Sequence, residues 1–227
     1  MNRVDAAWAI GRPVMGVPTA IATRFRSYGR ERMPRTGGLV VALNHFHWID
    51  IPAYGWSSPR PLYFLAKVEA HSVPIAGAYI RLFGSFAVRR GESDREAVRR
   101  MREVVREGHA LGVFVEGTRQ TSGVPGRAQP GAAMVALQEG VPVICAAIHG
   151  SQTWRLGNFA PVTVAWGEPM RFDGLARGAK GYREASAQIE AELHRLWAWL
   201  RDMHAAGRPR VAEPPRLPGS TAPVTLP

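Results

Sequence analysis

Short apolar runs alternate along this chain with segments in which apolar residues recur at helical spacing. The apolar runs predict β-strands over residues 39–43, 62–66, 85–88, 112–115, 141–148 and 162–166. The periodic segments predict helices over residues 77–82, 94–107, 131–138 and 182–204. Strands that alternate with helices are typical of an α/β fold. We therefore expect one α/β domain, which spans residues 28–206.

The segment before this domain, residues 1–27, mixes apolar and basic positions. Its uncharged stretches are too short to span a bilayer, and Arg12, Pro13 and Pro18 interrupt any cleavable signal pattern. Two interpretations fit it: an amphipathic segment that associates with a membrane surface, or an amphipathic helix packed on the domain. Its apolar residues include Trp8, Met15, Val17 and Ile21, and the flanking arginines are Arg3, Arg12, Arg24 and Arg26.

The segment after the domain, residues 207–227, is rich in proline. Six of its 21 residues are prolines, and few of the others are large and apolar. A segment of this composition buries too little apolar surface to fold by itself. We therefore expect a disordered tail from residue 207.

The net charge of +11 is unevenly distributed. Residues 1–35, 81–106 and 207–227 together hold the whole excess. Genome composition would explain the number of arginines, but it does not explain their positions. Clustered positive charge indicates an anionic partner such as phosphate, lipid headgroups or nucleic acid. A nucleic-acid-binding protein stays an alternative, but we do not expect a nucleic acid partner because helix 94–107 has no aromatic residue among its arginines.

The first candidate site follows the apolar run 39–43, where α/β folds place their functional groups. His45 and Asp50 lie five residues apart, across a predicted turn from strand to helix. This spacing can bring a carboxylate onto an imidazole N–H, which would make His45 a general base. With His47, the pair also resembles part of a metal site, and a metal-dependent hydrolase stays an alternative. We expect no metal, because the remaining histidines lack ligand spacing with these residues.

The second candidate site follows residues 112–115, again at the end of a predicted strand. Gly117 allows a sharp turn, Thr118 offers a hydroxyl, and Arg119 offers a bidentate donor for phosphate or carboxylate. Glu116 is close enough in sequence to hold the Arg119 guanidinium in place. A third strand, 85–88, leads into Arg89 and Arg90.

These segments resemble the glycerolipid acyltransferases typified by 1-acylglycerol-3-phosphate acyltransferase. Asn44, His45 and Asp50 match the Asn-His-x-x-x-x-Asp signature of that family in full. Residues 84–90 resemble its second motif, in which Arg90 takes the place of the arginine, residues 114–119 its third, and residues 141–144 its fourth. The resemblance runs from about residue 28 to residue 170.

The resemblance implies a mixed, mostly parallel sheet flanked by helices, and transfer of a fatty acyl group to a lipid hydroxyl. The expected acceptor is 1-acylglycerol 3-phosphate, which gives phosphatidic acid, with glycerol 3-phosphate or another lysolipid as alternatives. His45 would be the general base and Asp50 would orient it. The substrate-binding residues would be Arg90, Glu116, Gly117, Thr118 and Arg119.

The resemblance implies no cofactor, because an acyl-coenzyme A or acyl-carrier-protein thioester serves as co-substrate. It further implies peripheral or monotopic association with an anionic membrane, at the cytoplasmic face. The chain departs from the family pattern at Val115 and Cys145, which replace prolines, and at His47, where serine is common. These departures leave the His45–Asp50 pair intact.

Overall fold

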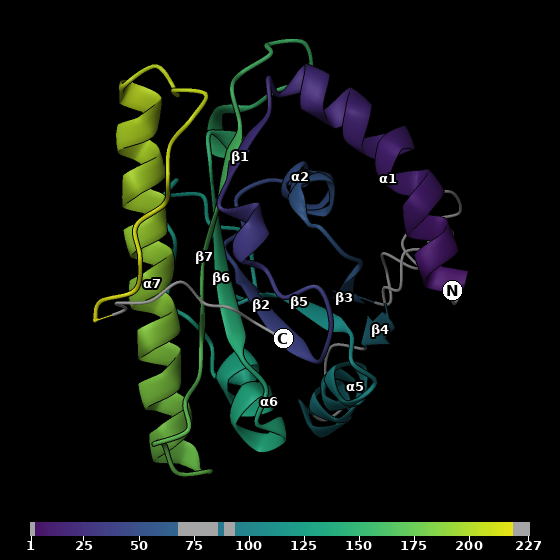
Figure 1. Ribbon diagram of the computed structural model, residues 1–227, viewed down its shortest axis with the longest axis vertical. Helices are drawn as coiled ribbons and strands as arrows, with labels where there is room; N and C mark the ends of the chain where they lie inside the picture. Colours follow the sequence, from purple (N-terminus) through teal and green to yellow (C-terminus); the bar gives the residue numbers. More distant parts are fainter. Residues whose placement is uncertain (1–2, 68–85, 89–93, 220–227) are drawn as a thin grey trace.

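The computed structural model describes residues 3–67, 86–88 and 94–219, and in this part of the chain seven strands form one sheet. Their order across the sheet is β1-β7-β6-β2-β5-β3-β4 (Figure 1). Only β7 and β6 are antiparallel among these neighbours, which confirms the mixed, mostly parallel sheet. The strands are β1 (Arg26–Tyr28), β2 (Leu39–Leu43), β3 (Leu62–Lys67), β4 (Phe86–Val88), β5 (Ala110–Phe114), β6 (Val143–His149) and β7 (Thr163–Met170).

Helices cover both faces of the sheet (Figure 1). One face packs against α5 (Asp94–Arg106), α6 (Gly131–Glu139) and α7 (Ala179–Ala205). The other packs against α1 (Arg3–Ala22) and α2 (Asp50–Ser57). β2 contributes alternate residues to the two apolar clusters and is buried throughout, as expected for a central parallel strand. The single α/β domain predicted from the sequence is therefore confirmed.

Most predicted elements are present with ends shifted by a few residues. The strand at 39–43 has its predicted bounds, and the helix at 94–107 ends one residue earlier. Sequence periodicity missed β1, because a three-residue edge strand carries almost no pattern. The predicted helix at 77–82 and the arginine at position 90 lie outside the described residues.

The N-terminal segment forms α1, and it combines features of both interpretations given above. Its inner face packs on α2, where the ring of Trp56 leaves no room for a β-carbon at Gly16. Its outer face exposes a row of apolar side chains at helical spacing, each between 44% and 70% exposed. These are Ile10, Val14, Val17 and Ile21. No helix in the described part of the chain is long and apolar enough to cross a bilayer.

Residues 208–217 were expected to be disordered, and this expectation needs correction. The hydroxyl of Tyr28 donates to the Pro209 carbonyl at 2.5 Å, and Arg32 donates to the Pro214 carbonyl at 2.7 Å. The Leu217 amide donates to a carboxylate oxygen of Glu168 at 2.8 Å. Proline composition did not reveal this packing, because the partners of the segment are side chains distant in sequence.

The arginines of α5 are less available to an anionic surface than their number suggests. Arg99 pairs with Glu96 and Glu103 along the helix, and Arg100 also pairs with Glu96. Two further arginines of α5, Arg102 and Arg106, pair with Glu139 of α6. These five ion pairs neutralise much of the basic face locally and join α5 to α6.

Candidate active site

The two main polar segments follow neighbouring strands and meet at one edge of the sheet. β2 and β5 run parallel, and their last residues, Leu43 and Phe114, are paired in register. The Val115 amide donates to the Leu43 carbonyl at 3.0 Å and extends this pairing by one step. Residues 44–50 and 115–120 therefore lie side by side, although they are far apart in sequence. This edge is where α/β folds place their functional groups.

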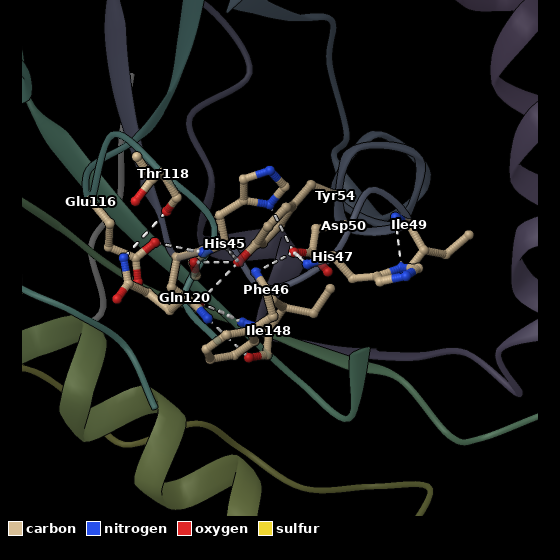
Figure 2. A network of polar contacts seen from close by, with 12 residues as sticks. His45, Phe46, His47, Ile49, Asp50, Tyr54, Glu116, Thr118, Gln120 and Ile148 are labelled. Atoms are coloured by element: carbon tan, nitrogen blue, oxygen red, sulfur yellow. Dashed lines mark hydrogen bonds and ion pairs between the residues drawn. The ribbon is translucent and has the colours of Figure 1, made fainter. Parts of the chain in front are cut away.

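His45 and Asp50 form the hydrogen-bonded pair that their spacing predicts (Figure 2). Nδ1 of His45 lies 2.9 Å from Oδ2 of Asp50, whose side chain is fully buried at the start of α2. The same oxygen accepts hydrogen bonds from the amides of Phe46, at 2.6 Å, and His47, at 2.8 Å. Three donors therefore converge on one carboxylate oxygen, and because that oxygen accepts from His45, the proton of the imidazole is placed on Nδ1.

The other ring nitrogen of His45, Nε2, has no partner among the described residues, so it is the atom available to accept a proton. The imidazole stacks on Phe114, with ring centroids 4.0 Å apart and planes at 21°. The stacking on Phe114 and the hydrogen bond to Asp50 together restrict rotation of the His45 ring. Sequence reasoning did not assign a role to Phe114, although its place in the third motif was a usable signal.

Glu116 holds the backbone of His45 rather than the Arg119 guanidinium that we expected it to hold. Its Oε2 accepts from the His45 amide at 2.8 Å, and its Oε1 accepts from the Gly126 amide at 3.0 Å. The Gln120 amide donates to the His45 carbonyl at 2.8 Å, so the 115–120 loop binds both backbone groups of His45 (Figure 2). Burial raises the pKa of Glu116 to about 7, and the charge of Asp50 adds to that rise, whereas the two amides oppose it.

Asn44 and Tyr54 form a buried polar group beneath the pair. The Asn44 side chain exchanges two hydrogen bonds with the backbone of Ile148, through Nδ2 at 3.2 Å and Oδ1 at 2.8 Å. The Tyr54 hydroxyl lies 3.0 Å from Oδ1 of Asn44 and 3.1 Å from the Ala146 carbonyl. These contacts fix the end of β2 to β6 and α2. The asparagine of the motif is therefore a structural residue, and Tyr54 was not identified from the sequence.

The remaining predicted residues differ in their exposure and placement. Gly117 has a φ of +73°, which only glycine adopts without strain, and Thr118 and Arg119 are exposed beside it. Arg90 lies outside the described residues, so its position relative to the pair is not described.

Two arginines bring positive charge to the site opening. Burial lowers the pKa of His47, and the charges of Arg155 and Arg119 contribute to this shift, so both guanidinium groups lie near the imidazole. Arg155 is exposed and follows Trp154, to whose carbonyl it donates at 2.7 Å. Sequence reasoning missed Arg155 because it lies in a loop outside the four motifs.

The described residues contain no group of three or more histidine, cysteine or acidic side chains that could hold a metal ion. His45 and His47 both lie near Asp50, but each uses Nδ1 for a protein hydrogen bond: His45 with Asp50, and His47 with the Ile49 amide at 3.4 Å. Nδ1 of each imidazole is therefore already engaged by a protein group.

An α/β fold with a carboxylate-oriented histidine at the sheet edge is typical of enzymes that activate a hydroxyl group with a general base. The family model described as Acyltransferase matches residues 24–149, which is more than half of the chain. The chain therefore belongs to the acyltransferase family, as the motifs predicted.

Individual relatives agree with this assignment. The chain is 26% identical over 145 residues to a 1-acyl-sn-glycerol-3-phosphate acyltransferase of Bacillus subtilis, covering 63% of this chain and 72% of that protein. It is 39% identical over 112 residues to a lyso-ornithine lipid O-acyltransferase of Pseudomonas aeruginosa, covering 48% of this chain and 42% of that protein. The chain thus spans less than half of the length of the second relative.

A solved structure has the same fold. It is the 1-acyl-sn-glycerophosphate (LPA) acyltransferase PlsC from Thermotoga maritima, which matches with a TM-score of 0.63 at 22% sequence identity. The match covers 85% of this chain and 79% of that chain. At this identity the likeness extends to the fold.

Proposed function

We propose that this protein transfers a fatty acyl group from an acyl thioester to the free hydroxyl of 1-acylglycerol 3-phosphate, which forms phosphatidic acid. The observation that carries the proposal is the His45–Asp50 pair, with Nε2 of His45 available at the edge of the sheet. Coenzyme A and acyl carrier protein are the two donor classes that supply such a thioester. Four relatives that match part of the chain are named as 1-acyl-sn-glycerol-3-phosphate acyltransferases and two more as probable ones. A seventh is named as a lyso-ornithine lipid O-acyltransferase.

In this mechanism, Nε2 of His45 accepts the proton of the acceptor hydroxyl as its oxygen attacks the thioester carbonyl. The C–O bond forms, the C–S bond then breaks, and the leaving thiolate takes the proton back from the imidazolium. Asp50 stabilises the imidazolium formed between the two steps. General base catalysis of this kind contributes about 10²–10⁴ in rate. No acyl-enzyme intermediate is needed.

Arg119 and Arg155 are suited to bind the phosphate of the acceptor. Both are exposed near His47, and neither forms an ion pair with a described residue. A guanidinium group binds phosphate through two parallel hydrogen bonds, which positions as well as attracts it. Thr118 lies next to Arg119 and offers a hydroxyl to the same ligand. Arg90 is proposed as a further phosphate ligand on the basis of its motif position.

The exposed row on α1 supports association with a membrane surface, at the cytoplasmic face where the anionic lipids and the thioester donors are found. The row is continuous at helical spacing from Ile10 to Ile21, and a lipid substrate has to be reached from the bilayer. In this proposal α1 lies in the membrane interface without crossing the bilayer, so the protein is a peripheral or monotopic membrane protein.

The proposal is tested by thioester consumption with a panel of lysolipids. We expect His45→Ala to abolish acyl transfer while circular dichroism and thermal unfolding stay those of the wild type. Turnover at the wild-type rate in this variant would refute the mechanism. The panel includes lyso-ornithine lipid, because the Pseudomonas relative makes another lysolipid a second candidate acceptor. Preference for lyso-ornithine lipid over 1-acylglycerol 3-phosphate would assign that second function.

A further inference from the structure

A cavity of about 510 Å³ lies between α1, the 3-10 turn η1 (Arg30–Arg32) and the connection from α2 to β3. Three arginines line it, namely Arg12, Arg30 and Arg60, and no acidic residue is among its described lining residues. The rest of its wall is formed mainly by tryptophan and proline side chains. A cavity with cationic and apolar walls fits a ligand that carries both an anionic group and an apolar body.

This cavity is distinct from the catalytic pair. Asp50 is the first residue of α2, whereas Trp56, which lines the cavity, lies near the end of that helix. The rise of an α-helix places these two residues about 9 Å apart along the axis. The cavity therefore lies at the opposite end of α2 from the active site, and neither His45 nor Arg119 lines it.

Two of the lining arginines, Arg12 and Arg30, form no ion pair with a described acidic side chain. Arg12 donates to the Trp56 carbonyl at 3.0 Å and 3.3 Å and lies over the Trp56 ring, 5.6 Å from its centroid. Burial lowers the pKa of Arg12, and the charge of Arg30 lowers it further. The Arg30 carbonyl accepts from the Met33 amide at 3.3 Å, but the Arg30 guanidinium forms no hydrogen bond or ion pair with a described residue. Two guanidinium groups thus repel one another here, in contrast to the paired arginines of α5.

Arg60 lines the cavity and binds the backbone of three other residues. It donates to the carbonyls of Pro34, at 3.3 Å, Gly37, at 2.9 Å, and Gly108, at 2.5 Å. Two of these bonds join the connection after α2 to the segment that follows η1, the turn that contains Arg30. Two of the lining arginines, Arg30 and Arg60, therefore belong to the α/β domain, whereas Arg12 belongs to α1.

We propose that this cavity binds the phosphate group of an anionic phospholipid of the membrane, with Arg12 and Arg30 as its ligands. α1 provides the continuity with a lipid surface, because it presents Arg12 on its inner side and the apolar row of Ile10, Val14 and Val17 on its outer side. A lipid phosphate would relieve the repulsion between the two guanidinium groups, and its glycerol and upper acyl carbons would contact Trp8 and Trp56. This site holds a lipid of the membrane and is separate from the acceptor site.

The test compares Arg30→Ala with Arg35→Ala. Arg35 is an exposed arginine of the same basic segment that does not line the cavity, so both variants lose the same charge. Both are made in the His45→Ala background, so that binding is measured without turnover. The probe is sedimentation with phosphatidylcholine vesicles that contain phosphatidylglycerol, a lipid that is neither acceptor nor product of the proposed reaction.

We expect Arg30→Ala to weaken partition into anionic vesicles by about tenfold or more, because it removes a ligand of a formed site. Arg35→Ala should weaken it by about fivefold at most, the effect of one basic residue near an anionic surface. Equal losses in the two variants would overturn the proposal and leave a diffuse electrostatic attraction.

A second measurement separates a lipid from a free phosphate. Short-chain phosphatidylglycerol below its micelle concentration should change tryptophan fluorescence in the Arg35→Ala variant and not in Arg30→Ala. Inorganic phosphate and glycerol 3-phosphate should compete only weakly, because they lack the apolar body that contacts the tryptophans. Competition by inorganic phosphate at the same concentration as the lipid would overturn the lipid assignment. Failure of acyl transfer in the wild type would leave these binding results unaffected.

Discussion

Replacement of Asp50 by asparagine tests the electrostatic role of the buried carboxylate. The change preserves shape and an oxygen that accepts from the amides of Phe46 and His47, but it removes the negative charge 2.9 Å from His45. At an effective dielectric constant of about 20, a charge pair at this distance is worth about 6 kcal/mol. Part of this energy is lost to relaxation, so we expect kcat to fall by about 10³–10⁴, the effect of about 4–5.5 kcal/mol.

The KM for the acceptor should change little, because Asp50 is fully buried and does not reach the substrate. The assay follows thiol release from the acyl donor with a chromogenic thiol reagent, at saturating acceptor. The matched control is Asp173→Asn, which makes the same chemical change at an exposed position. Thermal unfolding of both variants checks that the fold is retained. A loss in kcat below tenfold in a folded Asp50→Asn protein would refute the role given to this carboxylate.

Three further predictions follow from other parts of the structure. Arg119→Ala should raise the KM for a phosphorylated acceptor more than for an unphosphorylated one, and equal effects would argue against a phosphate contact. Burial lowers the pKa of His149 to about 4 and that of His204 to about 3, so the unfolded chain binds more protons below pH 6.5. The stability that these histidines contribute should therefore be complete above pH 6.5 and fall on acidification. His149→Phe should flatten this dependence in urea unfolding between pH 7 and pH 5, and an unchanged dependence would contradict the assignment. A chain that ends at residue 207 should unfold at a lower temperature than a chain that ends at residue 219. The shorter chain lacks the contacts of residues 208–217 with Tyr28, Arg32 and Glu168. Identical melting temperatures of the two chains would contradict this prediction.

The sequence predicted the core of the fold and the contact between His45 and Asp50 because both depend on local signals. The short apolar run 39–43 indicates a buried strand, and the structure confirms it. Polar residues directly after such a strand are expected at the edge of the sheet. The five-residue spacing of His45 and Asp50 spans a single turn into α2, so their contact follows from geometry within one segment.

Contacts between distant segments could not be predicted in this way. Glu116 was assigned to Arg119, its neighbour in sequence, but it binds the amides of His45 and Gly126. The arginines of residues 81–106 indicated an anionic partner, because the sequence did not reveal that Glu139, on another helix, pairs with two of them. In each case the residue type was noticed, but its partner depended on how the elements pack.

The pairing of β1 with β7 has a consequence for the order in which the protein assembles. Arg26 of β1 is paired with Thr163 of β7, so this edge of the sheet cannot form until most of the chain has been made. At translation rates of about 5–20 residues per second, the delay is on the order of ten seconds. During that interval α1, with its apolar row, has been made but the sheet edge that begins with β1 is incomplete. The apolar row of α1 is therefore available to the membrane surface proposed above before the sheet is complete.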